Sequence, residues 1–117
     1  MRRALFAAVL VLSTGVAAHP HSEAECREGG DFIGNAALSR DQGAPRQFMV
    51  GRLEEDLVAI RAFPPALRWF VQDADDERFL RAELEAVFDA PEASERHRAG
   101  FVERCLGRAR RASGSSA

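Results

Sequence analysis

The stretch SEAECREGGDFIGNAALSRDQG, residues 22–43, contains the signals for the start, the buried face and the end of one helix. Ser22 and Glu25 have the spacing of a capping box, in which each side chain binds the other residue's backbone amide. Behind this cap, small and apolar residues recur at steps of four, three and four, a pattern that aligns them on one helix face. These residues are Cys26, Gly30, Ile33 and Ala37. The stretch therefore predicts a helix that buries one side.

Three glycines interrupt this helix, at Gly29, Gly30 and Gly34. Because a glycine inside a helix costs up to about 1 kcal/mol, we expect these positions to admit a neighbouring helix at close range. Gly43 ends the segment, and Pro45 suits the first turn of the next helix.

The rest of the chain also has helical periodicity, with no strand-like alternation. We expect a second helix over Pro45–Ala62, a short third over Ala66–Gln72, a fourth over Asp73–Asp89 and a last one from Ser94. The expected core residues of these segments are Val50, Leu53, Leu57, Ile60, Leu67, Phe70, Val71, Phe79, Leu80, Leu84, Val87, Phe88, Phe101, Val102, Cys105 and Leu106. The predicted fold is all-α, a compact bundle of four or five short helices.

The chain contains two cysteines, Cys26 and Cys105. In an oxidising compartment an even cysteine count favours a disulfide, here one that would fasten the first helix to the last. Closing so long a loop stabilises by roughly 4 kcal/mol in the chain-entropy treatment. A redox-active pair, two free thiols and an intermolecular bridge are the alternatives, although catalytic pairs usually occupy a Cys-x-x-Cys turn.

The N-terminus has the three parts of a secretory signal peptide. Two arginines precede an apolar run, Ala4–Leu12, and small residues follow it. The run is too short for a membrane span, which needs about 20 residues. We predict a signal peptide over residues 1–18, cut after Ala18, with a cut after Ala17 as the alternative.

Cleavage would leave a helical domain over residues 19–106 and a disordered basic tail over residues 107–117. The predicted mature chain retains 14 of the 16 arginines and all 18 acidic residues, a net charge of −4, and it has no lysine. A mildly acidic domain argues against general nucleic-acid binding, which needs a basic face. The predicted location is the periplasm or the exterior of the cell, with no stable membrane insertion.

Histidines are the first candidates for a metal site. A mature terminus at His19 could bind copper through its amine and imidazole, with His21 as a second ligand. Pro20 opposes this because it lacks the amide proton that a square-planar site would use, so we expect an exposed terminus and no metal. His97, among charges on the last helix, is expected to face solvent.

Two further clusters have simple structural interpretations. The acids of residues 73–77 are too compact for a calcium loop, which spreads its ligands over twelve residues, and we assign them to a helix start. Trp69 lies one step off the apolar stripe around it, so it is the residue expected to reach the surface and contact a partner. We name no catalytic residue and no cofactor, because no nucleophile, base and orienting group fit together.

The order of motifs resembles the small two-cysteine exported proteins of proteobacteria that carry an Arg-Asp-x-Gly turn. The matching features are Cys26, the segment Ser39–Gly43, the late Val87-Phe88 with Pro91, and Phe101 with Cys105. The resemblance implies a helical, disulfide-closed domain and implies no activity. In outline the chain is also similar to periplasmic acid-stress chaperones, from which it departs in its long cysteine spacing and its lack of a Lys-rich end.

The predicted function is a non-enzymatic interaction or stress-associated module with an unidentified protein partner. One alternative is a chaperone-like client binder, which would need an apolar surface that forms in acid. A copper-binding protein that uses His19 and His21 is another, and an enzyme is a third.

Overall fold

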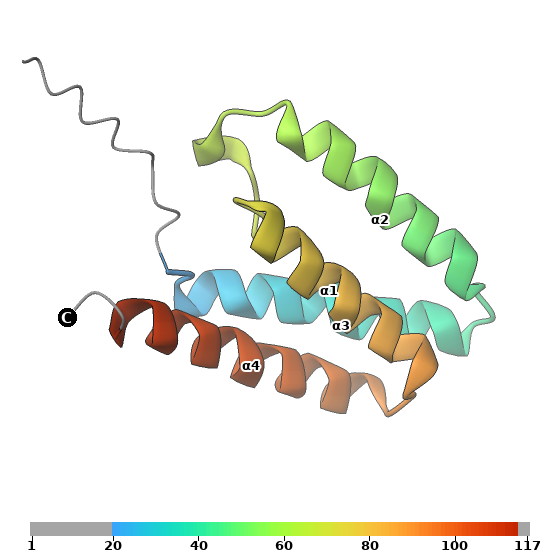
Figure 1. Ribbon diagram of the computed structural model, residues 1–117. Helices are drawn as coiled ribbons and strands as arrows, with labels where there is room; N and C mark the ends of the chain where they lie inside the picture. The colour runs from blue at the N-terminus through green and yellow to red at the C-terminus, as the bar shows by residue number, and fades with distance from the viewer. Residues whose placement is uncertain (1–19, 115–117) are drawn as a thin grey trace, which may run out of the picture.

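The computed structural model describes residues 20–114, and this part of the chain forms four α-helices and one 3₁₀ turn without strands. Figure 1 shows the bundle, which confirms the predicted all-α fold. The elements are α1 (Glu23–Asp41), α2 (Arg46–Arg61), η1 (Pro65–Leu67), α3 (Ala74–Asp89) and α4 (Ser94–Gly114). The predicted signal peptide, His19 and the last three residues lie outside the described part.

The local signals for α1 act as the sequence predicts. The Ser22 side chain accepts from the Glu25 amide at 3.1 Å, and the Glu25 carboxylate accepts from the Ser22 amide at 2.8 Å. At the other end, Gly43 adopts a φ of +98°, a backbone conformation that residues other than glycine rarely adopt. Proline at position 45 then precedes the first turn of α2.

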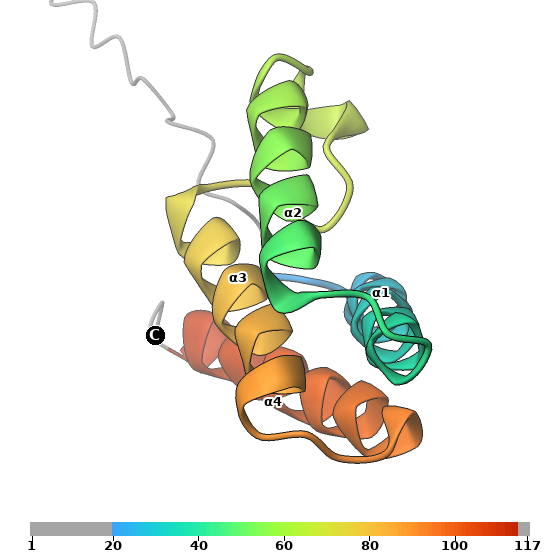
Figure 2. The same ribbon diagram turned by 90° about the vertical axis from the view of Figure 1, so that its right-hand side faces the viewer.

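Helices α1 and α4 form the most extensive helix–helix contact, and they lie side by side in Figures 1 and 2. Glycines allow this close approach: a Cβ at Gly30 would meet the Val102 side chain at 2.7 Å, and one at Gly29 would overlap the Phe101 ring. The predicted disulfide joins Cys26 to Cys105, with the Cα atoms 5.6 Å apart and both residues fully buried.

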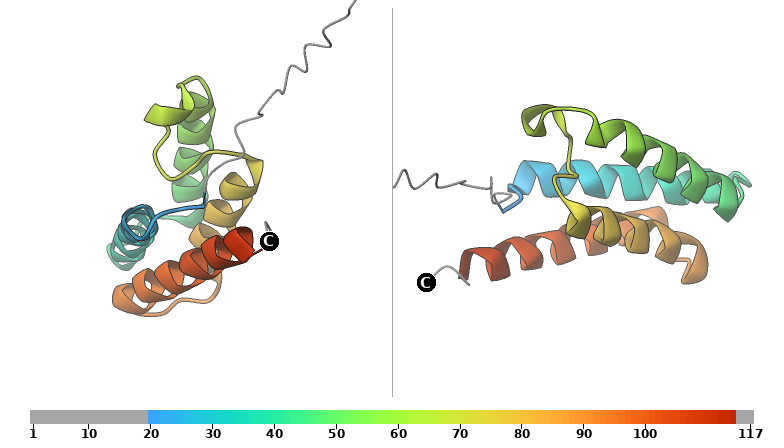
Figure 3. Two further views of the ribbon diagram at one scale, coloured as in Figure 1. Left: turned by 90° about the vertical axis from the view of Figure 1, so that its left-hand side faces the viewer. Right: turned by 45° about the horizontal axis from the view of Figure 1, so that its top comes forward.

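Helix α3 completes the core, packing on α1. The fully buried large side chains come from every part of the bundle: Ile33, Leu57, Phe70, Leu80, Leu84, Val87 and Phe101. Helix α2 lies on α3, at the side of the bundle away from α4 (Figure 3). Only Leu53 and Leu57 of α2 are buried, so α2 is the least embedded helix.

Two predictions about the helices are wrong. The third predicted helix is a single 3₁₀ turn, and Leu67 is 70% exposed. Around this turn, backbone carbonyls accept hydrogen bonds from side chains instead of from the amides of a continuing helix. Arg68 donates to the carbonyls of Phe63 and Arg61, and Gln72 donates to the carbonyl of Arg68.

The second wrong prediction is the disordered tail from residue 107. Residues 107–114 belong to α4. Arg108 explains the difference. Its guanidinium lies 4.3 Å from the centre of the Phe79 ring and donates to Asp76 at 3.2 Å. Helix α4 is thereby attached to α3 beyond Cys105.

Candidate functional site

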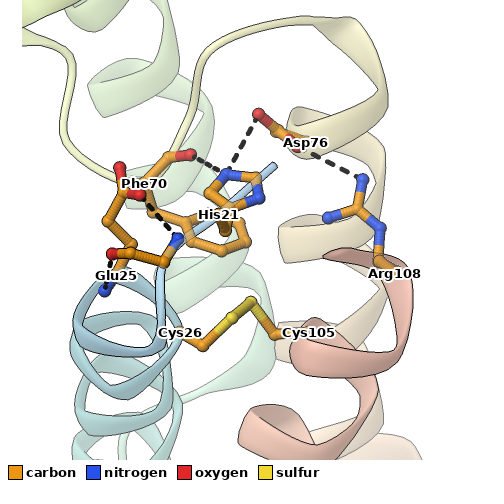
Figure 4. The surroundings of a disulfide bond; sticks show 8 residues. His21, Glu25, Cys26, Phe70, Asp76, Cys105 and Arg108 are labelled. Carbon is orange, nitrogen blue, oxygen red and sulfur yellow. Dashed lines mark hydrogen bonds and ion pairs between the residues drawn. A yellow bond between two sulfur atoms is a disulfide. The ribbon is translucent and has the colours of Figure 1, made fainter. Parts of the chain in front are cut away.

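His21 is buried, which contradicts the prediction of an exposed terminus. Its Nε2 lies 2.7 Å from the Phe70 carbonyl oxygen, and its ring stacks on the Phe70 ring with the centroids 4.2 Å apart (Figure 4). Because a carbonyl only accepts hydrogen bonds, Nε2 is the protonated nitrogen in this contact. The histidine therefore fastens the start of the chain to the segment before α3.

Asp76 organises the polar groups around His21. One carboxylate oxygen lies 3.4 Å from Nε2 of His21 and accepts from the Gln72 amide at 2.9 Å, while the other accepts from Arg108. Asp73 caps α3 by accepting from the Asp76 amide at 2.8 Å. These contacts confirm that the acidic cluster is a helix start.

Burial and hydrogen bonding act in opposite directions on this pair. Burial lowers the pKa of His21, but the contacts with Asp76 and the Phe70 carbonyl outweigh it and raise that pKa above its ordinary value. For Asp76, burial raises the pKa, and the hydrogen bonds from His21 and Gln72 bring it below the ordinary value. Both shifts favour the charged pair.

This cluster lies beside a hollow of about 490 Å³ lined by side chains of both signs, among them Asp75 and Arg111. Within residues 20–114 no group of three His, Cys, Asp or Glu side chains is arranged to hold a metal ion. Nε2 of His21 is occupied by the carbonyl contact, and His19 lies outside the described part. Copper binding through both histidines stays an untested alternative.

A second buried histidine, His97, contradicts the prediction that it faces solvent. Its Nε2 accepts from the Glu92 amide at 2.9 Å and lies 3.3 Å from Nη1 of Arg40. Burial and the positive charge of Arg40 lower the pKa of His97. The imidazole therefore stays neutral and holds the connection between α3 and α4.

Arg40 spans this same corner from the end of α1. Its guanidinium donates to the Val87 carbonyl at 2.7 Å and to the Glu92 carbonyl at 2.8 Å. Asp41 accepts from Arg40 at 2.8 Å, so its carboxylate orients the guanidinium. Through these contacts and its approach to His97, Arg40 joins the end of α1 to α3, to α4 and to the connection between them.

Trp69 is half-buried and meets the Phe32 ring edge-on, with the centroids 5.5 Å apart. Part of its surface stays accessible, but the indole packs against the core. Its contact with a partner stays a prediction.

The most exposed large apolar side chains lie on α2 and in the segment after it. Phe48 is 56% exposed and Val58 is 62% exposed. Together with Gly51, Glu55 and Ala62 they recur at steps of three and four, opposite the buried Leu53 and Leu57. We call these five residues the α2 outer face.

Small and charged groups complete this face. A Cβ at Gly51 would meet nothing within 4 Å, so the middle of the face is open. The Arg52 guanidinium lies 6.0 Å from the centre of the Phe48 ring. Arg52 and Glu55 form no ion pair with any residue between 20 and 114.

The opposite side of α2 is fastened to α3 by three sets of ion pairs, which we call the α2–α3 ladder. Arg46 donates to Glu85 at 2.8 Å and to Asp89 at 2.9 Å. The other two sets are Arg81 with Glu54, at 3.2 Å for one of its two contacts, and Arg61 with Glu77, at 2.9 Å. Charge pairs therefore supplement the narrow apolar seam between the two helices.

The sequence of α2 contains a signal for its outer face, although its periodicity alone predicted a single buried stripe. Apolar and small residues occur all around α2, and a helix with two apolar faces is expected to be covered on both. The buried histidines gave no such signal, because their partners lie far away along the chain.

No helix within residues 20–114 is long and apolar enough to cross a membrane. A comparison of the chain with protein-family models, curated proteins and solved structures finds no match.

Proposed function

We propose that the chain is an exported, non-enzymatic interaction protein, associated with stress, that binds a protein partner through the α2 outer face. The exposure of Phe48 and Val58 on one stripe is the observation that carries this proposal. Covering one such side chain stabilises a complex by about 1.5–3 kcal/mol. The two side chains lie about 15 Å apart along the helix, and exposed apolar side chains that share one face are typical of interaction sites.

The disulfide supports an exported location. Bridges such as Cys26–Cys105 persist in oxidising compartments and are rare in the cytosol. The N-terminal signal pattern agrees with this placement. Intact mass of the protein recovered from the periplasm or medium would test it, with His19 as the expected first residue. An uncleaved chain confined to the cytoplasm would contradict it.

Site-specific photo-crosslinking tests the interaction. A photoreactive amino acid at Val58 is expected to form a discrete adduct in the producing cell, because this side chain lies on the proposed contact surface. The matched control is the same group at Arg96, whose side chain in α4 is 77% exposed and lies among charges. Equal adducts at both positions, or none at Val58, would contradict the proposal.

A second candidate, an acid-activated client binder, is favoured by the α2–α3 ladder. Arg61 holds the pKa of Glu77 below its ordinary value, and Arg46 does the same for Asp89. These ion pairs therefore persist in mild acid and are lost as the pH falls through the lowered pKa values. Release of α2 would then uncover Leu53 and Leu57. The disulfide does not restrain α2, since it joins α1 to α4.

Aggregation of an acid-denatured test enzyme distinguishes this candidate. The oxidised protein is expected to suppress aggregation near pH 3 and not at pH 7. Glu77→Gln removes one charge of the ladder and should shift the onset of suppression to higher pH. The matched control is Glu83→Gln, an equally shielded carboxylate that pairs with Arg104 of α4. The same onset in both variants would refute release of α2.

A further inference from the structure

We propose that the partner of the α2 outer face is a second copy of this chain, packed antiparallel about a two-fold axis near Leu53 and Glu54. The inference rests on the proposed function, because it names the partner of the same surface. In a two-fold interface each contact occurs twice, so the face must be complementary to itself. Apolar shape and charge both meet this condition.

The charge pattern sets the register. Arg52 and Glu55 lie at equal distances on either side of the proposed axis, 1.5 residues from it, which is about 2 Å along a helix. In an antiparallel pair, Arg52 of one subunit therefore lies opposite Glu55 of the partner subunit, and the reverse pair forms as well. Both side chains are exposed and form no ion pair within residues 20–114.

The apolar groups fit the same register. Phe48 is displaced from the axis toward the start of α2, and Val58 is displaced by a similar length toward its end. Phe48 would therefore pack on Val58 of the partner subunit and cover an otherwise exposed ring. Gly51 lies near the crossing point, where the open space above it allows two helices to approach closely.

The charges also favour a second copy over other protein partners. Beside its apolar residues the face has exposed charges of both signs: Glu55 lies within it, and Arg52 lies at its edge with Asp56 one turn further along α2. A uniformly acidic or basic partner would satisfy one of them and repel the other. A second copy presents the same charges of both signs, so an antiparallel arrangement pairs each with its opposite.

The size of the face sets the expected strength. Helix α2 has 16 residues, a length of about 24 Å. Its outer stripe covers less than the roughly 800 Å² per partner that is usual in stable complexes. The dimer should therefore be a reversible one that forms as the concentration rises.

Charge reversal tests the register directly. Analytical ultracentrifugation of the oxidised full chain, from about 1 μM to about 1 mM, should show a monomer–dimer equilibrium. Arg52→Glu alone and Glu55→Arg alone place like charges opposite each other and should each weaken the dimer about tenfold at low salt. The double variant restores two opposite-charge pairs and should recover the wild-type dissociation constant within about threefold. Val58→Ser should weaken the dimer at any salt concentration.

Three outcomes would overturn the inference. They are a wild-type protein that remains monomeric over the whole range, a double variant no better than the single ones, or dimerisation unchanged by Val58→Ser. Circular dichroism of each variant checks that α2 still folds. A monomeric protein whose Val58 photoprobe still captures another exported protein would refute self-pairing and leave the proposed function standing.

Discussion

Individual glycines of this chain have opposite roles, which depend on what surrounds each Cα. At Gly29 the neighbouring Phe101 ring occupies the place of a side chain, whereas at Gly51 nothing lies within 4 Å of a Cβ. We predict that Gly29→Ala destabilises by about 1–3 kcal/mol through overpacking. Gly51→Ala should stabilise the monomer by up to about 1 kcal/mol through helix propensity. Urea unfolding at low protein concentration compares the two, and equal effects would contradict this assignment.

The two buried histidines should give opposite pH dependences. The pKa of His21 is raised, so the stability it contributes is present below its unfolded value of about 6.5 and is lost as pH rises through the folded pKa. The pKa of His97 is lowered, so the unfolded chain takes up a proton more readily and stability is lost as pH falls below about 6.5.

The difference in unfolding free energy between pH 8 and pH 5 measures these contributions. His97→Gln is expected to remove a loss at pH 5, so the variant gains stability on acidification relative to the wild type. His21→Gln is expected to remove a gain, so it loses relative stability over the same interval. Shifts of the same sign in the two variants would show that one of the assigned environments is wrong.

Among the elements, α1 was predictable because its signals are local. The capping box, the spaced small residues and Gly43 all act within one helix, and the structure agrees with each. The segment after α2 was not predictable in this way, because its carbonyl groups bind Arg68 and Gln72 side chains. The features of the candidate site also differ in how far the sequence predicts them. The disulfide could be inferred from two cysteines, whereas the partners of His21 and His97 depend on tertiary packing.

The last two turns of α4 should contribute to stability, although their composition is typical of a disordered tail. Arg108→Ala removes the Phe79 contact and one partner of buried Asp76. We expect a loss of about 1–3 kcal/mol, since Asp76 would keep only its other contacts. Arg110 is exposed, and Arg110→Ala should change stability by no more than about 0.5 kcal/mol. Thermal unfolding of both variants checks this, and equal melting temperatures would contradict the role of Arg108.

For the molecule as a whole, the disulfide and the ion pairs divide the bundle into parts of unequal stability. Helices α1 and α4 share the bridge and the closest packing, while α2 is held by two buried leucines and the α2–α3 ladder. Regions with few buried contacts open locally at lower free energy than the core. Hydrogen exchange in α2 should therefore occur without global unfolding.

Removal of the bridge should separate these two parts. The double variant Cys26→Ala/Cys105→Ala loses a covalent loop constraint over 79 residues, which should lower its free energy of unfolding by roughly 4 kcal/mol. Exchange in α1 and α4, which requires global opening, should then accelerate by up to about a thousandfold. Exchange in α2 should change far less, because its local opening does not involve the bridge. Hydrogen exchange followed by mass spectrometry gives both rates, and a parallel acceleration of α2 and α4 would show that the bundle opens as one unit.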